Sequence, residues 1–116
     1  MEIINLNNIE QIVLCKYEIE QQSGIKVSLT DFINQNIPND VYFYSNVTFP
    51  FALKEYYGKQ YLFIVSEDES VVKRLINKLK LCKYDTNNLT EVSNTDMINM
   101  EDDDKEFFII NNKYYK

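Results

Sequence analysis

The stretch that decides the fold is QYLFIVSEDESVVKRLINKLKLC, which runs from Gln60 to Cys82. Its start, Gln60 to Val65, carries apolar residues on both faces of an extended chain, which indicates a strand in the middle of a sheet. Ser66 followed by Glu69 has the spacing of a capping box, with Ser66 as the N-cap. Apolar residues then recur on one helical face, at Val71, Val72, Leu75, Ile76, Leu79 and Cys82. The stretch therefore predicts a strand followed by an amphipathic helix over roughly residues 67–82.

Two further helices are predicted before this stretch. The first begins after Asn7-Asn8, either of which can cap it, and ends at Ser23-Gly24, where Gly24 suits a left-handed backbone. Its apolar arc consists of Ile9, Ile12, Val13, Cys15 and Ile19. A short second helix is capped by Ser28 and stopped by Pro38.

The remaining pattern predicts strands and turns. Strands are expected at Val41–Tyr44, at Val47–Tyr57 with Pro50 at an edge or bulge, and at Leu89–Val92. Gly58-Lys59 indicates a hairpin turn, and Phe107–Ile110, Asn111-Asn112 and Lys113–Tyr115 indicate a C-terminal hairpin or one bulged strand. We therefore expect a single α+β domain over residues 1–116. Its antiparallel sheet of about four to six strands would pack against two main helices.

Composition excludes several classes of function. The chain has 116 residues and no histidine, so imidazole catalysis and histidine metal ligands are absent, and we expect neither an enzyme nor a cofactor. No apolar run is long enough for a membrane helix and no signal peptide is recognisable, so a cytoplasmic protein is expected. Cys15 and Cys82 are then expected to be reduced and buried. The net charge of −6 argues against direct nucleic-acid binding and favours a basic protein partner.

The strongest functional signal is an acidic segment between residues 85 and 106. It contains Asp85, Glu91, Asp96, Glu101, Asp102, Asp103, Asp104 and Glu106, with Lys105 as its only base. A calcium loop needs alternating oxygen ligands and a glycine at its bend, which this segment lacks. It is either a solvated loop or a surface for a basic partner, in which carboxylates occupy the places of nucleic-acid phosphates.

Two other groups of residues have ordinary structural explanations. The basic side of the predicted helix contains Lys73, Arg74, Lys78, Lys80 and Lys83, and we interpret it as a solvent-facing side rather than a phosphate-binding one. Tyrosines gather in or beside the strands, at Tyr42, Tyr44, Tyr56, Tyr57 and Tyr61. Core packing and cross-strand pairing explain them, with a protein interface as the alternative.

The passage from Tyr61 to Ile76, YLFIVSEDESVVKRLI, resembles the strand-to-helix passage of a family of small Cas9 inhibitors carried by Listeria prophages. In that family a strand also leads through a Ser-Glu…Glu-Ser sequence into an amphipathic helix, and an acid-rich segment follows. The family is small and acidic, and it blocks Cas9 by occupying the site of the target DNA. The resemblance implies that Asp85 and Glu101 to Asp104 would face the basic DNA-binding surface.

These observations lead to one principal hypothesis and two alternatives. The principal hypothesis is a phage- or mobile-element-encoded inhibitor that blocks a nucleic-acid-handling enzyme, such as a CRISPR effector, through an acidic surface. The first alternative is an immunity protein or antitoxin that covers a toxin. The second is a viral accessory or structural protein without inhibitory activity. The oligomeric state stays open at this point.

Overall fold

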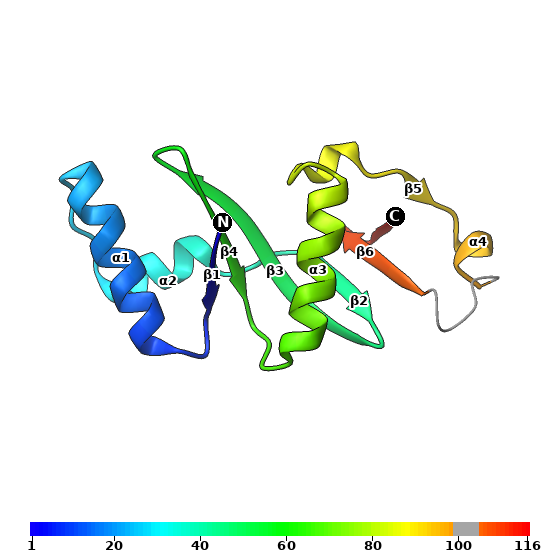
Figure 1. Cartoon of the computed structure of the whole chain (residues 1–116), viewed down its shortest axis with the longest axis horizontal. Helices are drawn as coiled ribbons and strands as arrows, with labels where there is room; N and C mark the ends of the chain where they lie inside the picture. Colours follow the sequence, from blue (N-terminus) through cyan, green and yellow to red (C-terminus); the bar gives the residue numbers. More distant parts are fainter. Residues whose placement is uncertain (99–104) are drawn as a thin grey trace. The chain divides into compact units, whose positions relative to one another are not determined.

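The computed structural model describes residues 1–98 and 105–116 and has the α+β class that the sequence predicts (Figure 1). The chain divides into two compact units. Unit 1 consists of residues 1–39 and 51–67, and unit 2 consists of residues 40–50 and 68–116. The strands are hydrogen-bonded in the order β1-β4-β3-β2-β6-β7-β5, and β3 (Val47–Tyr56) contributes to both units.

Unit 1 is built around a central strand. Strand β4 (Lys59–Ile64) pairs in parallel with β1 (Glu2–Asn5) and antiparallel with the second half of β3. Helix α1 (Ile9–Ser23) packs against β1 and against α2 (Leu29–Asn36) (Figure 1). The buried core of this unit consists of Ile4, Ile12, Cys15, Phe32, Tyr61 and Phe63. The predicted central position of the Gln60–Val65 strand is therefore confirmed.

The ends of both helices in unit 1 follow the sequence signals. The side chain of Asn8 accepts a hydrogen bond from the Gln11 amide, and that of Ser28 accepts one from the Asp31 amide. Gly24 has a φ of 71°, and its amide donates to the Glu20 carbonyl at 2.9 Å. A residue with a Cβ would be strained there, which explains why the helix ends at a glycine.

The hairpin between β3 and β4 turns one residue earlier than predicted. Tyr56 pairs with Lys59, so Tyr57 and Gly58 form the two-residue loop. Their φ values of 52° and 79° are those of a type I′ turn, which matches the twist of the flanking strands. Positive φ is unfavourable for a residue with a Cβ, and Gly58 avoids this cost at the second position of the turn.

Unit 2 contains the remaining strands. Strand β2 (Val41–Ser45) pairs with the first half of β3 and with β6 (Glu106–Ile110), and β7 (Lys113–Tyr115) joins β6 to β5 (Glu91–Val92). Asn111 and Asn112 both have positive φ and form the predicted C-terminal hairpin turn. The shorter helical elements are the 3-10 turn η1 (Thr86–Asn88) and α4 (Asn94–Ile98).

Aromatic rings make up much of the sheet core in unit 2. The Phe43 ring lies 5.1 Å from that of Phe108 and 5.9 Å from that of Phe49, measured between centroids. Helix α3 (Glu69–Leu81) contacts β2, and the Arg74 guanidinium donates to the Ser45 hydroxyl at 3.1 Å. The predicted apolar face of this helix is confirmed, because Val71, Val72, Leu75 and Leu79 are buried.

Three predictions about the elements are corrected. The N-cap of α3 is Asp68 and not Ser66, because the Asp68 carboxylate accepts from the Ser70 and Val71 amides. Over residues 1–98 and 105–116 the sheet has seven strands, because the sequence analysis did not predict β1, which pairs in parallel with β4. In the N-terminal helix, Ile9 and Val13 were expected inside but are 55% and 47% exposed.

Two further expectations can be compared with the structure. Both cysteines are free and buried, as predicted. Over residues 1–98 and 105–116, no helix is long and apolar enough to cross a membrane.

Candidate protein-binding surface

The acidic segment begins beside η1 in unit 2. Asp85 is exposed, and its carboxylate accepts a hydrogen bond from the Asn87 amide at 2.9 Å. This contact caps the 3-10 turn and leaves lone pairs of the carboxylate open to solvent. Asp85 therefore has a local structural role, and its negative charge still faces the exterior.

Glu91 lies on strand β5, the end strand of the hydrogen-bonded order. It is exposed and sits opposite Tyr115 of β7. Two backbone hydrogen bonds between Thr90 and Lys116, of 2.9 and 3.2 Å, extend this short pairing. A charged residue on an edge strand also discourages pairing with the edge of another sheet.

The other described acids of the segment lie on α4 and β6. Asp96 is exposed in the first turn of α4, and its amide donates to the Ser93 hydroxyl at 3.2 Å. Glu106 is half-buried at the start of β6 and lines a hollow of about 160 Å³ together with Lys78 and Lys116. The four predicted residues Glu101, Asp102, Asp103 and Asp104 lie outside the described residues.

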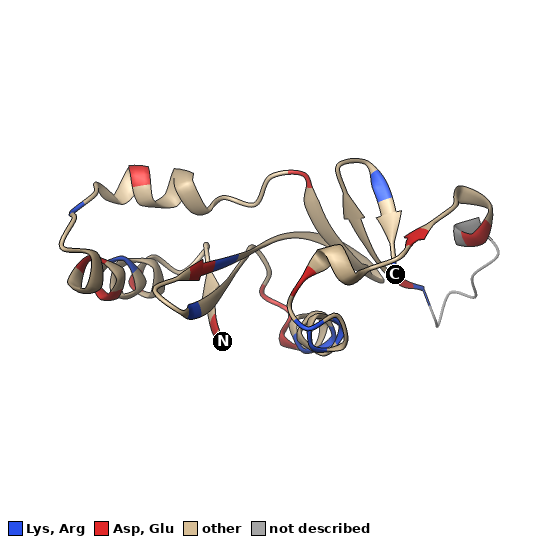
Figure 2. Cartoon of the chain, turned by 90° about the horizontal axis from the view of Figure 1, so that it is seen from above, with Lys and Arg blue, Asp and Glu red and all other residues tan. Residues whose placement is uncertain are grey.

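The described acids of this segment share one electrostatic property. Within the part of the chain that the structure describes, neither Asp85, Glu91, Asp96 nor Glu106 takes part in an ion pair. They come from four different elements of unit 2, so the chain presents separated carboxylates (Figure 2). We call Asp85, Glu91, Asp96 and Glu106 the acidic surface.

In unit 1, by contrast, some of the acids form ion pairs with a lysine. The Lys59 ammonium lies 2.7 Å from a carboxylate oxygen of Glu2 and 3.0 Å from one of Glu18. The hydrogen bond from Lys59 lowers the pKa of Glu18, and the bonds to Glu2 and Glu18 raise the pKa of Lys59. Tyr61 donates its hydroxyl proton to Glu18 at 3.3 Å. These charges stabilise the unit internally and are not available to a partner at full strength.

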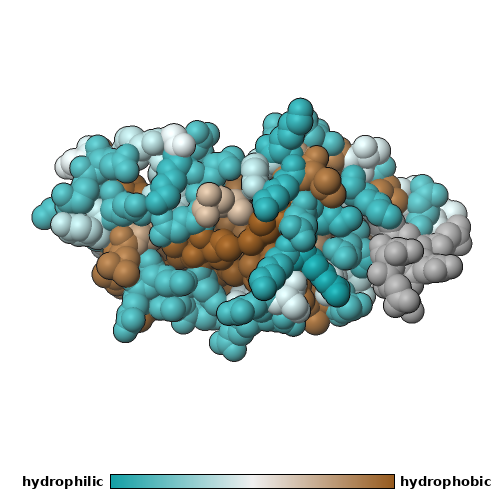
Figure 3. Space-filling model, viewed as in Figure 1, coloured by the Kyte–Doolittle hydropathy of each residue, from teal (hydrophilic) through white to brown (hydrophobic). Residues whose placement is uncertain are grey.

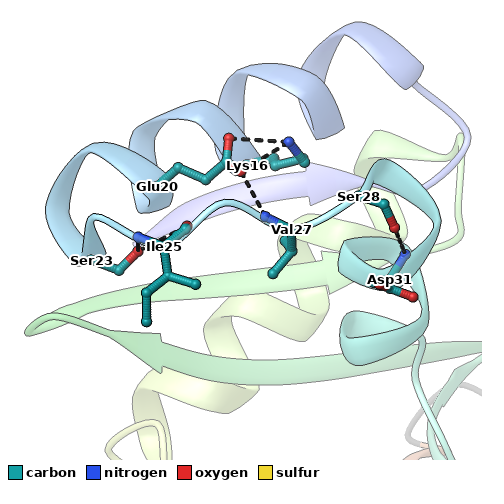
Figure 4. A network of polar contacts seen from close by, with 7 residues as sticks. All are labelled: Lys16, Glu20, Ser23, Ile25, Val27, Ser28 and Asp31. Atoms are coloured by element: carbon teal, nitrogen blue, oxygen red, sulfur yellow. Dashed lines mark hydrogen bonds and ion pairs between the residues drawn. The ribbon is translucent and has the colours of Figure 1, made fainter.

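A hollow of about 180 Å³ lies in unit 1 beside the connection between α1 and α2. Figure 4 shows the polar contacts of this connection. Lys16 and Glu20 form an ion pair of 3.1 Å at its wall, and Glu20 also accepts from the Val27 amide at 2.9 Å. Ser23 and Ile25 exchange hydrogen bonds along the same connection. Because these polar groups bond to one another, they hold the connection between the two helices in place.

The two cysteine thiols of the core are poorly suited to act as nucleophiles. Burial raises the pKa of the Cys15 thiol to about 12, so the thiolate is scarce at neutral pH. Cys82 is buried, and its Sγ lies 3.3 Å from the Leu79 carbonyl. Among the described residues, no cluster of three acids or cysteines is arranged to hold a metal ion.

Several exposed residues were not singled out by sequence reasoning. Leu14 and Tyr17 on α1 are 68% and 61% exposed, and with Ile9 and Val13 they place four apolar residues on the outward side of the helix, beside the exposed Glu10. The signal was present, because α1 has apolar residues on both sides of the helix. The basic residues of α3 do face solvent, with Lys73 and Lys80 exposed and Lys78 half-buried.

Comparison of the chain with protein-family models, with curated proteins and with solved structures gives no significant match.

Proposed function

We propose that this chain is a stoichiometric inhibitor that binds a basic, nucleic-acid-handling enzyme in the cytoplasm through its acidic surface. The observation that carries the proposal is the set of carboxylates at Asp85, Glu91 and Asp96, which are exposed and make no ion pair in the described part of the chain. An enzyme that binds nucleic acid presents arginine and lysine side chains, which accept a carboxylate in place of a phosphate.

The charge of the whole segment adds to this argument. Residues 85–106 contain eight acids and one base, a net charge of −7 in a chain whose total is −6. Such a concentration of one sign speeds the encounter with an oppositely charged surface. It also discourages binding to nucleic acid itself, so the expected target is a protein.

The resemblance of the passage from Tyr61 to Ile76 to small phage inhibitors of Cas9 suggests a particular target class. In this chain the passage spans β4, the cap at Asp68 and the start of α3, and the acidic segment follows the helix. A CRISPR effector such as Cas9 holds its nucleic acid in a positively charged channel. That channel is the kind of surface the carboxylates would occupy.

The direct test is inhibition of DNA cleavage by a purified Cas9–guide RNA complex. The parent protein should inhibit cleavage, and the triple variant D85N/E91Q/D96N should need on the order of tenfold higher concentration. Raising the salt concentration should weaken inhibition by the parent, because the attraction between exposed charges is screened.

A matched control removes three charges from unit 1. The variant D31N/E55Q/E67Q changes three exposed acids outside the acidic surface and loses the same net charge. It should inhibit as the parent does. Equal weakening by both variants would reduce the effect to net charge, and a parent that leaves cleavage untouched would exclude Cas9 as the target. Affinity purification with mass spectrometry would then identify the partner.

A further inference from the structure

The hollow in unit 1 has a mostly apolar wall that is drawn from several segments of the chain. Its apolar lining includes Ile19 of α1, Val27 of the connection, Phe32 of α2, and Tyr56 and Tyr57 of the β3–β4 hairpin. Hydrophobic side chains reach the surface at several places on the molecule (Figure 3), so exposure alone does not mark a binding site. This hollow differs because its apolar side chains surround a concave space, which is the usual form of a site for a small ligand.

Two of the aromatic rings in this wall are held in place by their other contacts. Phe32 is 3% exposed and lies edge-on to the Phe63 ring, with 6.4 Å between the ring centroids. The Tyr56 hydroxyl donates to Asn36 Oδ1 at 2.6 Å, and Asn36 is completely buried. A ligand therefore meets a wall that is already formed, and binding loses less free energy to the ordering of side chains.

The charged groups that line the hollow balance each other. Among the described residues that line it, only Lys16 and Glu20 are charged, and they form an ion pair of 3.1 Å (Figure 4). The pKa of Glu20 is lowered mainly by its hydrogen bonds from Lys16 and the Val27 amide. The charge of Lys26 contributes less, and this exposed residue does not line the hollow. The lining therefore selects neither an anion nor a cation, and it favours a neutral ligand.

The size of the hollow limits the ligand to a small ring system. Its volume is about 180 Å³, whereas an apolar cavity of about 150 Å³ takes up benzene and sites for drug-sized ligands usually measure about 300–1,000 Å³. The hollow is open to solvent at its rim, where Ile25 and Tyr57 are 67% and 58% exposed. A small ring that is only partly enclosed should bind with a dissociation constant on the order of 1 mM.

We propose that this hollow binds a small, neutral aromatic molecule of one ring or two fused rings. The ligand would bury apolar surface against Ile19 and Val27 and would pack on the aromatic rings of the wall. An aromatic ligand is favoured over an aliphatic one, because pairs of aromatic rings gain stabilisation beyond the area that they bury. The site lies in unit 1 and does not depend on the proposed inhibition, which uses the acidic surface of unit 2.

An NMR titration of the isotope-labelled full chain with indole, up to about 10 mM, tests the site. The amide signals of Val27 and Tyr57 should shift and should saturate with a dissociation constant on the order of 1 mM. Indole-3-acetate and tryptamine carry the same ring with a negative and a positive charge, and neither should bind more tightly than indole. Tighter binding of a charged compound would overturn the neutral class. A parent whose amide signals at the hollow do not respond to indole would overturn the site itself.

Two variants change the hollow in opposite ways. Tyr57→Asn removes one aromatic ring from the rim and keeps the hairpin, because asparagine followed by glycine is preferred in a type I′ turn. Its melting temperature should not fall, and its dissociation constant for indole should rise roughly fivefold. Val27→Phe adds a ring on the connection and fills the hollow, so the dissociation constant should rise about tenfold or more.

The matched control is Leu14→Asn, which also removes a large exposed side chain from unit 1. Leu14 is 68% exposed on α1 and does not line the hollow, so this variant should bind indole as the parent does. Unchanged binding in Tyr57→Asn and Val27→Phe would show that indole binds elsewhere and would overturn the proposal. Equal weakening in Leu14→Asn would do the same, because the effect would then not be specific to the hollow.

Discussion

Units 1 and 2 have the same net charge but use their acids in different ways. Unit 1 contains seven acids and four bases, and unit 2 contains eleven acids and eight bases, so each has a net charge of −3. In unit 1 three glutamates are ion-paired with Lys16 or Lys59. In unit 2 the acids of the acidic surface form no ion pair with any described residue. Four other acids of unit 1 also form no ion pair with a described residue, namely Glu10, Asp31, Glu55 and Glu67. The concentration of acids between residues 85 and 106, rather than pairing alone, therefore sets the acidic surface apart.

The long helices of the two units differ in which side chains they bury and which they expose. Helix α3 of unit 2 buries Val71, Val72, Leu75 and Leu79 on one face and exposes lysines on the other. Helix α1 of unit 1 buries only Ile12 and Cys15 and exposes large apolar residues. The two units thus offer surfaces of opposite character. Salt should weaken contacts through the acidic surface, because the attraction between exposed charges is screened.

The largest losses in the free energy of unfolding are expected when a large side chain is removed from the core of either unit. Phe63 and Leu75 are both completely buried. Phe63→Ala in unit 1 should cost about 3–5 kcal/mol, and Leu75→Ala in unit 2 about 2–5 kcal/mol, because each leaves a cavity. Urea melts measure the loss, and thiol labelling of Cys15 and Cys82 reports the opening of each unit separately.

The labelling pattern decides whether the two units unfold as the single domain that the sequence predicts. With one cooperative transition, each substitution should speed the labelling of both cysteines. With independent units, Phe63→Ala should expose only Cys15 and Leu75→Ala only Cys82. A neutral Leu75→Ala would contradict the buried face assigned to α3.

A smaller effect is expected from a buried hydrogen-bond pair in unit 1. The Tyr56 hydroxyl donates to Asn36 Oδ1 at 2.6 Å, and Asn36 Nδ2 donates to the Phe32 carbonyl at 2.8 Å. Asn36 is fully buried, so Asn36→Ala should cost about 1–3 kcal/mol by leaving these groups without partners. The double variant with Tyr56→Phe should cost less than the sum of the two single changes in chemical melts. Additive costs would show that the pair does not act as a unit.

Local signals in the sequence identify most helix ends because capping groups act over three or four residues. Asn8, Ser28 and Gly24 could be recognised for this reason. Strand β1 could not, because its partner Tyr61–Ile64 is about sixty residues away and the four residues Glu2–Asn5 lack turn signals around them. A strand that short is defined by its neighbour rather than by its own composition.

The surface was harder to predict than the elements. The acidic segment was visible as a run of charges, yet its division among η1, β5, α4 and β6 required the structure. The exposure of Ile9 and Val13 was misjudged because α1 has apolar residues on opposite sides, so its pattern does not reveal which side faces the core.

A modest loss of stability is expected when the N-cap of α3 is removed. The sequence predicts Ser66 as this cap, whereas the structure shows Asp68. Asp68→Ala should cost about 1 kcal/mol, because the Ser70 and Val71 amides lose their acceptor. The Ser66 backbone carbonyl accepts from the Asn5 side chain at 2.7 Å. Ser66→Ala keeps that carbonyl and the Asp68 carboxylate, so the Ser70 and Val71 amides keep their acceptor and the substitution should cost less than Asp68→Ala. Denaturant melts of the two variants compare them directly, and the reverse ranking would restore Ser66 as the cap.

The smallest expected effect is a change in stability with pH. It tests whether the ion pair between Glu18 and Lys59 in unit 1 contributes to folding. The pKa of Glu18 is lowered in the folded protein, first by its hydrogen bond from Lys59. Folding therefore favours the ionised form, and the resulting stability is present above the ordinary glutamate pKa of about 4.3 and is lost as the pH falls through the folded value. Glu18→Gln should lower the melting temperature at pH 7 slightly and should match the parent in strong acid. The control is Glu91→Gln, since Glu91 forms no ion pair in the described part of the chain. Its melting temperature at pH 7 should match that of the parent, and an equal loss in both variants would show that the ion pair of Glu18 does not account for the loss.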